Sequence, residues 1–354
     1  MMRKLLAVLV LVLVTGACGG GTAAQPSPSV AQSAAASAAA GTGSPVDMAA
    51  AKAEGTVSWY TSTPQDQAQK ISELFTAQTG IKVQLFRSGG EAVMTRFLTE
   101  QDAGKIAADV VTTSDTAPFN ALARDGKLLK FTPKGADTVP ASAKSADGTW
   151  ISQRLNLVVP AFRTDKVKDP PTSWKDLADP RFKGQLVIAD PAFTSIAYLV
   201  VHSLARDLGW EYFKKVAANG TMIVQGHAQL STTLISGERS VAIESDFGQL
   251  FTEAQKGTPI KMVVPSEGVF LINSPMGIPS KAPHPNAARA LIEFNLSKDV
   301  QDLFIASGTY SPRADFPAPK TYPELKALKI IPVDYDAAER DNKKTKDMFA
   351  ETFK

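Results

Sequence analysis

Short apolar runs that end in small polar residues recur along this chain and predict alternating strands and helices. The clearest run is Leu186–Ala189, which is apolar throughout, as expected of a strand buried on both faces of a parallel sheet. Asp190 and a proline end this strand, and Thr194 and Ser195 then precede an apolar helical stretch. A helix start of this kind offers free N–H groups and a partial positive charge to a small polar or anionic ligand. The alternative is an ordinary strand–helix turn with a helix cap.

The same arrangement is predicted on both sides of this run. Each predicted strand leads into a loop rich in serine, threonine, glycine or acidic residues, and most of the loops lead into a helix. The other such strands are expected at residues 55–60, 81–86, 108–111, 221–224, 240–243 and 260–264. Parallel strands joined by right-handed crossovers place these loops on one edge of the sheet, where ligands of open α/β sheets bind.

Two longer extended stretches, 150–161 and 269–278, separate the strand–helix modules and predict a hinge. About 300 residues follow the N-terminal region, which is more than a typical single core holds. We therefore expect a two-lobed α/β fold with a ligand cleft between the lobes. The predicted boundaries are 52–155 and 270–310 for lobe 1, 156–269 for lobe 2, and 311–354 for a helical C-terminal tail that packs across one lobe.

The first residues predict export and anchoring. A short basic segment and an apolar run, 5–14, precede small residues and Cys18, and this run is shorter than the about 20 residues that span a bilayer. The segment resembles the lipobox of bacterial lipoproteins, which implies that signal peptide 1–17 is removed and Cys18 is acylated. Residues 18–51, rich in alanine, serine, glycine and proline, predict a flexible tether. The folded part would then lie at the outer face of the cell membrane or in the periplasm.

Composition excludes several classes of function. The 38 lysine and arginine residues and 35 acidic residues are interspersed, and no basic stripe with aromatic residues predicts nucleic-acid binding. Cys18 is the only cysteine, so the mature chain has no thiol for catalysis or for a metal. Three scattered histidines and the absence of Gly-x-Ser-x-Gly, His-Glu-x-x-His and Walker motifs argue against an enzyme. We expect a monomer without a cofactor or resident metal.

The loops at the predicted strand ends supply the candidate ligand-binding residues. Hydroxyl groups, glycine N–H groups and helix starts suit oxyanions. The candidates are Ser62, Thr63, Ser88, Gly89, Gly90, Thr113, Ser114, Arg154, Thr194, Ser195, Gly226, His227, Glu244 and Asp246.

Several candidates have an alternative interpretation. The 88–90 loop could bring backbone N–H groups to an anion or form a plain turn. Arg154 could bind a carboxylate or phosphonate with two hydrogen bonds, or be a solvated charge at a strand edge. Glu244 and Asp246 could pair with an amine of the ligand, and Asp246 could instead cap a helix. For His227, which has no metal-ligand spacing to another histidine, packing at a helix start is the favoured interpretation.

Several segments carry a family resemblance, and they are spread over most of the chain. They are Thr-Val-Ser-Trp-Tyr-Thr-Ser at 56–62, Ala-Asp-Val-Val at 108–111, the Ser-Trp-Lys-Asp-Leu-Ala-Asp-Pro-Arg-Phe-Lys-Gly run within 172–184, Ala-Asp-Pro at 189–191 and Gly-Trp-Glu-Tyr-Phe-Lys-Lys at 209–215. Residues 52–354 resemble the extracellular solute-binding proteins of ABC importers, in the branch of ferric-ion-, phosphonate- and sugar-phosphate-binding proteins. The resemblance implies a two-lobed type II periplasmic-binding fold whose closure presents a solute to a permease.

One departure from the family bears on the ligand. Ferric members carry adjacent tyrosines after the strand that matches Ser240–Glu244, whereas this chain has Asp246, Phe247 and Gly248 there. Phenylalanine cannot coordinate a metal, although Glu244 or Asp246 could still supply the oxygen donors that iron favours. We therefore expect a small anionic or zwitterionic organic solute of the phosphonate, sugar-phosphate or organic-acid type. Ferric iron or an iron chelate is the alternative ligand, and a ligand receptor for a sensor kinase is the alternative class.

Overall fold

The computed structural model describes residues 45–354. The predicted signal peptide, Cys18 and most of the predicted tether lie outside these residues. The tether prediction extends too far, because helix α1 (Met48–Glu54) begins before residue 51. Asp47 caps this helix by accepting hydrogen bonds from the backbone N–H groups of Ala49 and Ala50, each at 3.0 Å. No helix within the described residues is long and apolar enough to cross a membrane.

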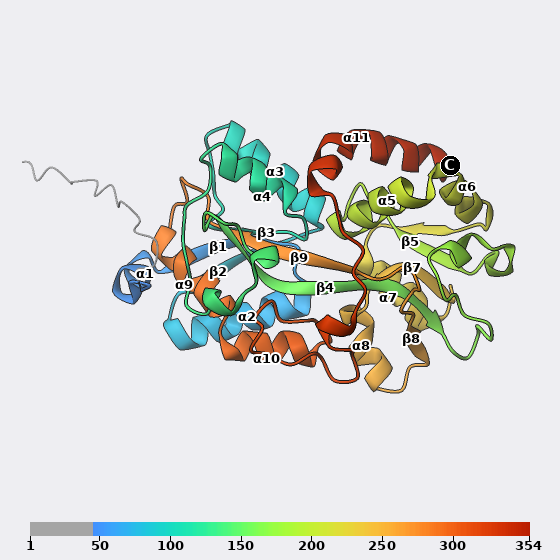
Figure 1. Ribbon diagram of the computed structural model, residues 1–354. Helices are drawn as coiled ribbons and strands as arrows, with labels where there is room; N and C mark the ends of the chain where they lie inside the picture. The colour runs from blue at the N-terminus through green and yellow to red at the C-terminus, as the bar shows by residue number, and fades with distance from the viewer. Residues whose placement is uncertain (1–44) are drawn as a thin grey trace, which may run out of the picture. The chain divides into compact units, whose positions relative to one another are not determined.

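A mixed nine-stranded sheet runs through the described residues (Figure 1). Its order is β2-β1-β3-β9-β4-β7-β5-β6, with β8 paired to β4. The strands are β1 (Thr56–Thr61), β2 (Lys82–Arg87), β3 (Val110–Thr112), β4 (Trp150–Arg163), β5 (Leu186–Ala189), β6 (Met222–Val224), β7 (Val241–Asp246), β8 (Ile260–Met262) and β9 (Phe270–Gly277). Strands β1, β2 and β3 are parallel, as are β5, β6 and β7.

Helices connect and cover these strands. The remaining α-helices are α2 (Gln65–Thr79), α3 (Gly90–Asp102), α4 (Ala117–Arg124), α5 (Ser195–Leu208), α6 (Trp210–Ala218), α7 (His227–Ser236), α8 (Gly248–Gln255), α9 (Pro285–Asn295), α10 (Lys298–Ala306) and α11 (Tyr335–Thr352). We call β1–β3 with α2–α4 lobe 1, and β5–β7 with α5–α8 lobe 2. In each lobe the carboxyl ends of the parallel strands lie at one edge, as βα connections require.

Strands β1 and β5 are buried on both faces, and successive side chains point to opposite faces of the sheet. Trp59 and Val187 belong to one apolar cluster that runs along one face of both lobes. Their neighbours Tyr60 and Ile188 point to the opposite face and join two separate clusters, one in each lobe. The two lobes therefore share a core on one face of the sheet and are divided on the other.

Strands β4 and β9 form the connection between the lobes. They pair with each other in antiparallel fashion, with Leu157 opposite Leu271. Strand β9 also pairs with β3 of lobe 1, and β4 pairs with β7 of lobe 2. The predicted boundary between residues 155 and 156 falls inside the single 14-residue strand β4, and the lobe boundaries stay a prediction.

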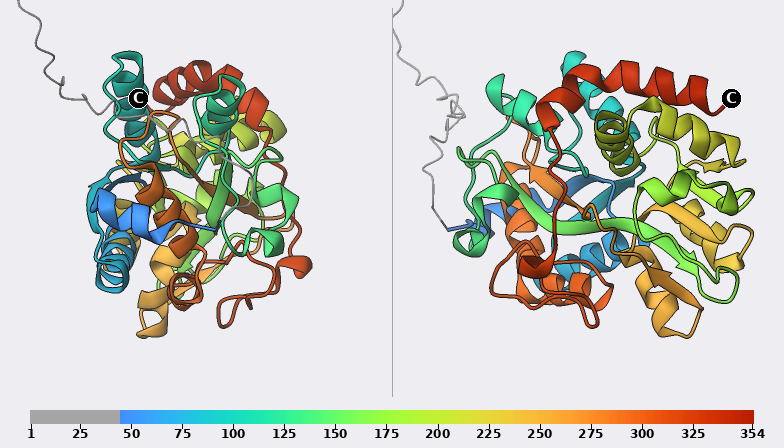
Figure 2. Two further views of the ribbon diagram at one scale, coloured as in Figure 1. Left: turned by 90° about the vertical axis from the view of Figure 1, so that its left-hand side faces the viewer. Right: turned by 45° about the vertical axis from the view of Figure 1, so that its right-hand side comes forward.

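The C-terminal tail is less helical than predicted. Residues 311–334 contain only the short 3₁₀ helix η5 (Leu325–Ala327), and α11 begins after Asp334, whose side chain caps it. Ala338 and Phe349 of α11 belong to the apolar cluster of lobe 2. Figure 2 shows α11 lying over α5 and reaching toward α3 and α4. Helix α11 of the tail therefore packs mainly on lobe 2.

Candidate functional site

A cavity of about 180 Å³ lies where the carboxyl ends of the parallel strands of both lobes meet. We call it the cleft cavity. The predicted residues that line it are Ser62, Gly89, Gly90, Ser114, Arg154, Thr194, Ser195, Gly226, His227 and Asp246. Its volume corresponds to roughly six to twelve water molecules. The structure therefore brings these residues together around a space that suits a small solute.

Four predicted residues lie beside the cleft cavity rather than on its wall. Thr63 is buried and accepts a hydrogen bond from the Gln153 side chain at 2.7 Å. Ser88 is half-buried in the turn after β2. The Thr113 hydroxyl donates to a backbone carbonyl at 3.4 Å, and Thr113 lines a neighbouring pocket. Glu244 is completely buried beneath the wall and contacts His227.

Two guanidinium groups give the cleft cavity its positive charge. Arg154 on β4 is 2% exposed, so it is not a solvated charge at a strand edge. Within residues 45–354 its nearest carboxylate is Asp246, with an Nη1–Oδ2 distance of 3.7 Å, and its Nε has no hydrogen-bond partner. Arg87, at the end of β2, uses Nε to donate to the Thr63 carbonyl at 3.0 Å. Both groups therefore keep donors available for an anion.

Asp246 is the only acidic residue among those that line the cleft cavity. It is the last residue of β7 and is 3% exposed. Helix α8 begins at Gly248 without a side-chain cap, so Asp246 is not a helix cap. Burial lowers the pKa of Arg154, and the nearby Asp246 carboxylate partly offsets this. With two guanidinium groups and one carboxylate, the wall complements a solute that carries an acidic group and an amine.

The 88–90 loop brings the two lobes into contact. A Cβ at Gly89 would lie 2.4 Å from the carbonyl oxygen of Phe193, and a Cβ at Gly90 would lie 2.4 Å from Oγ of Ser195. Both contacts cross from lobe 1 to lobe 2. Glu91 adds a polar contact, because one of its carboxylate oxygens accepts from the Ser195 hydroxyl at 3.1 Å. Its other oxygen accepts from Lys346 of α11 at 2.5 Å.

A buried pair lies under the lobe 2 wall. Glu244 Oε1 accepts from the Ala189 N–H at 2.8 Å, and Glu244 Oε2 lies 2.5 Å from Nε2 of His227. The other ring nitrogen of His227, Nδ1, lies 3.3 Å from the Thr194 hydroxyl. Burial lowers the pKa of His227 and the Glu244 carboxylate raises it, with a net shift upward. His227 starts α7, as predicted, but it also faces the cleft cavity.

Sequence reasoning missed several residues of the wall. Arg87 is not among the predicted candidates, although an arginine directly before a glycine-rich loop is a usable signal for an anion site. Phe193 lies in the loop that was singled out, but its contact with the opposite lobe has no local signal. The other missed residues are Ile196, Gln225, Ala228, Gln229 and Gln249.

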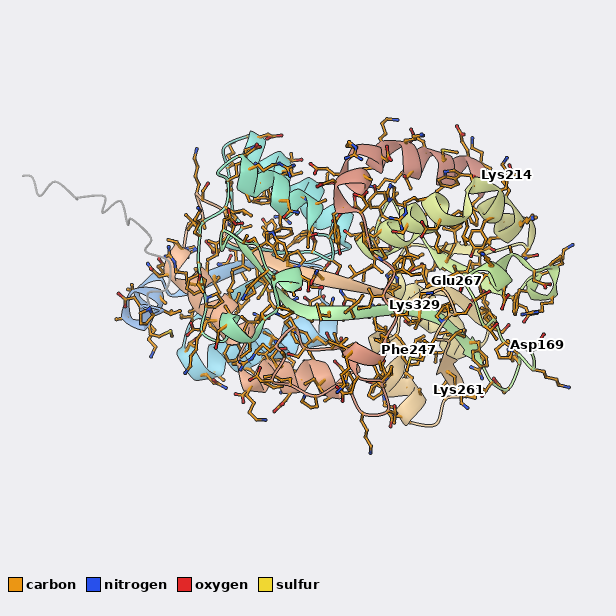
Figure 3. The ribbon with its side chains drawn as sticks, viewed as in Figure 1. Asp169, Lys214, Phe247, Lys261, Glu267 and Lys329 are labelled. Carbon is orange, nitrogen blue, oxygen red and sulfur yellow. The ribbon has the colours of Figure 1, made fainter. Side chains whose placement is uncertain are left out.

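The wall offers little to a metal ion. Phe247, labelled in Figure 3, lies at the junction of β7 and α8, and its ring contacts Tyr322 at a centroid distance of 5.9 Å. No tyrosine among the residues that the structure describes lines the cleft cavity. Residues 45–354 contain no group of three or more histidine, cysteine or acidic residues that could hold a metal ion.

Comparisons with known proteins agree with this architecture. The profile of the family described as "Bacterial extracellular solute-binding protein" matches residues 105–338, and the chain belongs to this family. The "Putative 2-aminoethylphosphonate-binding periplasmic protein" of Salmonella paratyphi A is 27% identical over 259 residues, which cover 70% of this chain and 72% of the relative. "Iron uptake protein A1" of Synechocystis sp. is 27% identical over 275 residues, covering 72% and 74%.

A solved structure shows the same fold. AfuA from Actinobacillus pleuropneumoniae, with exogenous fructose-6-phosphate bound, matches with a TM-score of 0.75 and 21% identity over 84% of this chain and 98% of that chain. The predicted family and the two-lobed α/β fold of type II periplasmic binding proteins are confirmed. The chain is an extracytoplasmic solute-binding protein of the ABC-importer class, and its family and structural neighbours are transport components rather than enzymes.

Proposed function

We propose that this protein captures a small organic solute carrying a phosphonate, phosphate or carboxylate group and delivers it to an ABC permease. The observation that carries the proposal is the pair of guanidinium groups on the cleft cavity. Among the described residues, buried Arg154 has one carboxylate partner, Asp246, at 3.7 Å and so beyond hydrogen-bonding distance, and Arg87 commits its Nε to the Thr63 carbonyl. A buried cation that is weakly paired favours a bound anion, because the anion replaces the hydration that burial removed.

Asp246 narrows the solute class. A zwitterion with an amine could pair with this carboxylate while its acidic group contacts the two arginines. The small volume of the cleft cavity fits a short phosphonate better than a peptide. A relative whose name carries 2-aminoethylphosphonate and a neighbour with bound fructose-6-phosphate support this chemistry.

Iron is the weaker candidate. A relative is named as an iron uptake protein, but Phe247 stands in the segment where ferric members of the family resemblance carry tyrosines, and no tyrosine among the described residues lines the cleft cavity. Two guanidinium groups would also repel a bare trivalent cation.

We further propose that the protein works as a monomer, that it has no catalytic role, and that acylated Cys18 holds it at the outer face of the membrane.

Isothermal titration of the full-length protein in detergent tests the solute class. The panel contains 2-aminoethylphosphonate, fructose-6-phosphate, citrate, ferric citrate and ferric ion. Saturable binding of an organic anion without iron is the expected result, and ligand at 100 times its dissociation constant should add about 2.7 kcal/mol to the unfolding free energy. Binding of iron alone, with a visible charge-transfer band, would overturn the proposal. Loss of uptake of the bound solute on gene deletion would separate a transport role from a sensor-kinase receptor.

A further inference from the structure

The Thr194 hydroxyl is held by a histidine rather than by its helix. Thr194 occupies the N-cap position of α5, where a threonine side chain ordinarily accepts from a backbone N–H, but it makes no such bond. Its hydroxyl instead lies 3.3 Å from His227 Nδ1. Both residues line the cleft cavity and are more than nine-tenths buried. The direction of this hydrogen bond therefore decides what the hydroxyl offers to a solute.

The Glu244–His227 pair fixes where the protons lie. Because Glu244 Oε1 already accepts from the Ala189 N–H, Oε2 is the oxygen that faces His227 Nε2. One proton lies between Oε2 and Nε2, whichever of the two atoms holds it. A second proton, when present, is on Nδ1. Titration of the pair therefore removes the Nδ1 proton, which is the one that faces Thr194.

We propose that the Glu244–His227 pair sets the polarity of the Thr194 hydroxyl, so that the proton-loaded pair makes Thr194 a hydrogen-bond donor to an anionic oxygen of the solute. With a proton on Nδ1, His227 donates to Thr194, and the hydroxyl proton is directed into the cleft cavity. Without it, Nδ1 accepts the hydroxyl proton, and Thr194 presents only lone pairs. This inference rests on the proposed function, and it makes His227 a positioning residue that acts through Thr194.

The acidic groups around the Glu244–His227 pair favour the state in which Nδ1 of His227 carries a proton. Strand β7 supplies Glu244 and Asp246, and both raise the pKa of His227 against the effect of burial. Arg154 on β4 and Arg87 on β2 are the cations that line the cleft cavity, and a nearby positive charge disfavours a protonated imidazole. The elements β5, β6 and α8, which also pack against α7, place no other charged residue on the wall. A bound anion would strengthen the loaded state, so binding should take up a proton when the pair is partly titrated.

A purely structural role would look different. The pair also links α7 to β7, and a simple cross-link would lower stability when removed without giving Thr194 any dependence on pH. The two roles are therefore distinguished by how affinity depends on pH in variants with and without the Thr194 hydroxyl. Thr194→Val removes the hydroxyl at nearly constant volume, and Thr194→Ser keeps it. His202→Gln is the matched control, because His202 is buried on α5 but lies outside the cleft cavity.

Titration calorimetry of the full-length protein with 2-aminoethylphosphonate from pH 6 to pH 9 tests the inference. Comparison between variants cancels the ionisation of the solute itself. As the pH rises from 6 to 9, affinity should fall about tenfold more in proteins that keep the hydroxyl than in Thr194→Val. The proteins that keep it are the wild type, Thr194→Ser and His202→Gln. Tenfold is the loss expected for one hydrogen bond to a charged group. An identical pH profile in Thr194→Val and the wild type would overturn the inference.

Nitrogen NMR of the solute-free protein separates this inference from the proposed function. With ¹⁵N-labelled histidine, the chain gives signals from only three rings. The Nδ1 signal of His227 should change from protonated to unprotonated with rising pH, and Thr194→Val should alter it. If 2-aminoethylphosphonate fails to bind, the proposed function fails, and this spectrum still decides the proton position. An Nδ1 signal that keeps one state throughout would contradict the switch.

Discussion

Arginine side chains carry the chemistry of the cleft cavity at the scale of single residues. Arg154 extends from the hinge strand β4, and Arg87 extends from the end of β2. A guanidinium presents a rigid set of donors that matches the two oxygens of a phosphonate or carboxylate, whereas a lysine presents a point charge. Replacing arginine by lysine therefore keeps the charge and removes the paired geometry.

Arg154→Lys and Arg87→Lys should each weaken binding of 2-aminoethylphosphonate by tenfold or more. The reason is that each loses a charge-assisted hydrogen bond, which contributes about 1.5–3 kcal/mol. Titration calorimetry measures the effect. Arg96→Lys, on the exposed side of α3, is the control and should bind as the wild type does. Unchanged affinity in both cavity variants would remove the basis for an anionic solute.

Asp115 gives the fold a dependence on pH. It is buried after β3, where its carboxylate accepts from the Ala117 N–H at 2.9 Å. Burial raises its pKa to about 7. Since the unfolded chain releases this proton near pH 3.9, the folded state binds more protons between about pH 4 and 7. Stability from this group therefore falls as the pH rises through that window.

Asp115→Asn should stabilise the protein at pH 8, where the wild type buries a charge. The expected gain in unfolding free energy is on the order of a few kcal/mol, because each unit of pKa shift corresponds to about 1.4 kcal/mol. Thermal or denaturant unfolding should show the difference shrinking as the pH is lowered to 4. Asp125→Asn, on the exposed end of α4, serves as the comparison. A gain that is independent of pH would argue against a buried charge.

At the scale of elements, the first residue of α3 shows how the lobes approach. Gly90 has no positive φ, so its backbone conformation does not require glycine. Its constraint is space, because a Cβ added at Gly90 would come within 2.4 Å of Oγ of Ser195 at the start of α5. The first residues of α3 and α5 therefore lie in contact, and any side chain larger than hydrogen at Gly90 would hold the two lobes apart.

Gly90→Ala should weaken solute binding by disfavouring closure. It should not lower thermal stability, because alanine favours a helix over glycine by about 1 kcal/mol. Ser195→Gly removes the opposing side chain, so the double variant should recover part of the affinity lost in Gly90→Ala. Calorimetry on the four members of this cycle measures the coupling. Additive losses would show that the contact does not limit closure.

The sequence predicted the strands better than it predicted the contacts between lobes. Runs such as Leu186–Ala189 reveal buried strands because burial on two faces requires continuous apolar side chains. Segment 311–334 is predicted to be helical, but it is largely irregular. A long helix begins only after Asp334, whose side chain caps α11. The composition of the 88–90 loop predicts either an anion-binding loop or a plain turn, and it carries no information on contacts with the other lobe. Its contact with Phe193 depends on a residue about 100 positions away, which no local pattern contains.

At the scale of the whole molecule, the described residues form a state in which the lobes touch. Glu91 of lobe 1 contacts Ser195 of lobe 2 and Lys346 of α11. Arg124 of α4 also reaches Glu339 of α11 at 3.3 Å. These two ion pairs are not fully buried, and a solute that touches both lobes can shift the equilibrium between open and closed forms by its differential affinity.

Addition of 2-aminoethylphosphonate should reduce the radius of gyration of the full-length protein. Small-angle neutron scattering with contrast-matched detergent isolates the protein signal. The reduction is expected because Arg87 of lobe 1 and Thr194 of lobe 2 must lie close together to contact one solute. An unchanged scattering profile at saturating solute would count against closure as the mechanism of capture.

The most direct test of the central claim is a crystal structure of the protein with 2-aminoethylphosphonate. The expected result places the phosphonate oxygens within hydrogen-bonding distance, about 2.7–3.2 Å, of the guanidinium nitrogens of Arg87 and Arg154. The amine is expected beside Asp246. A solute bound away from the cleft cavity, or a metal ion held there without an organic anion, would contradict the account.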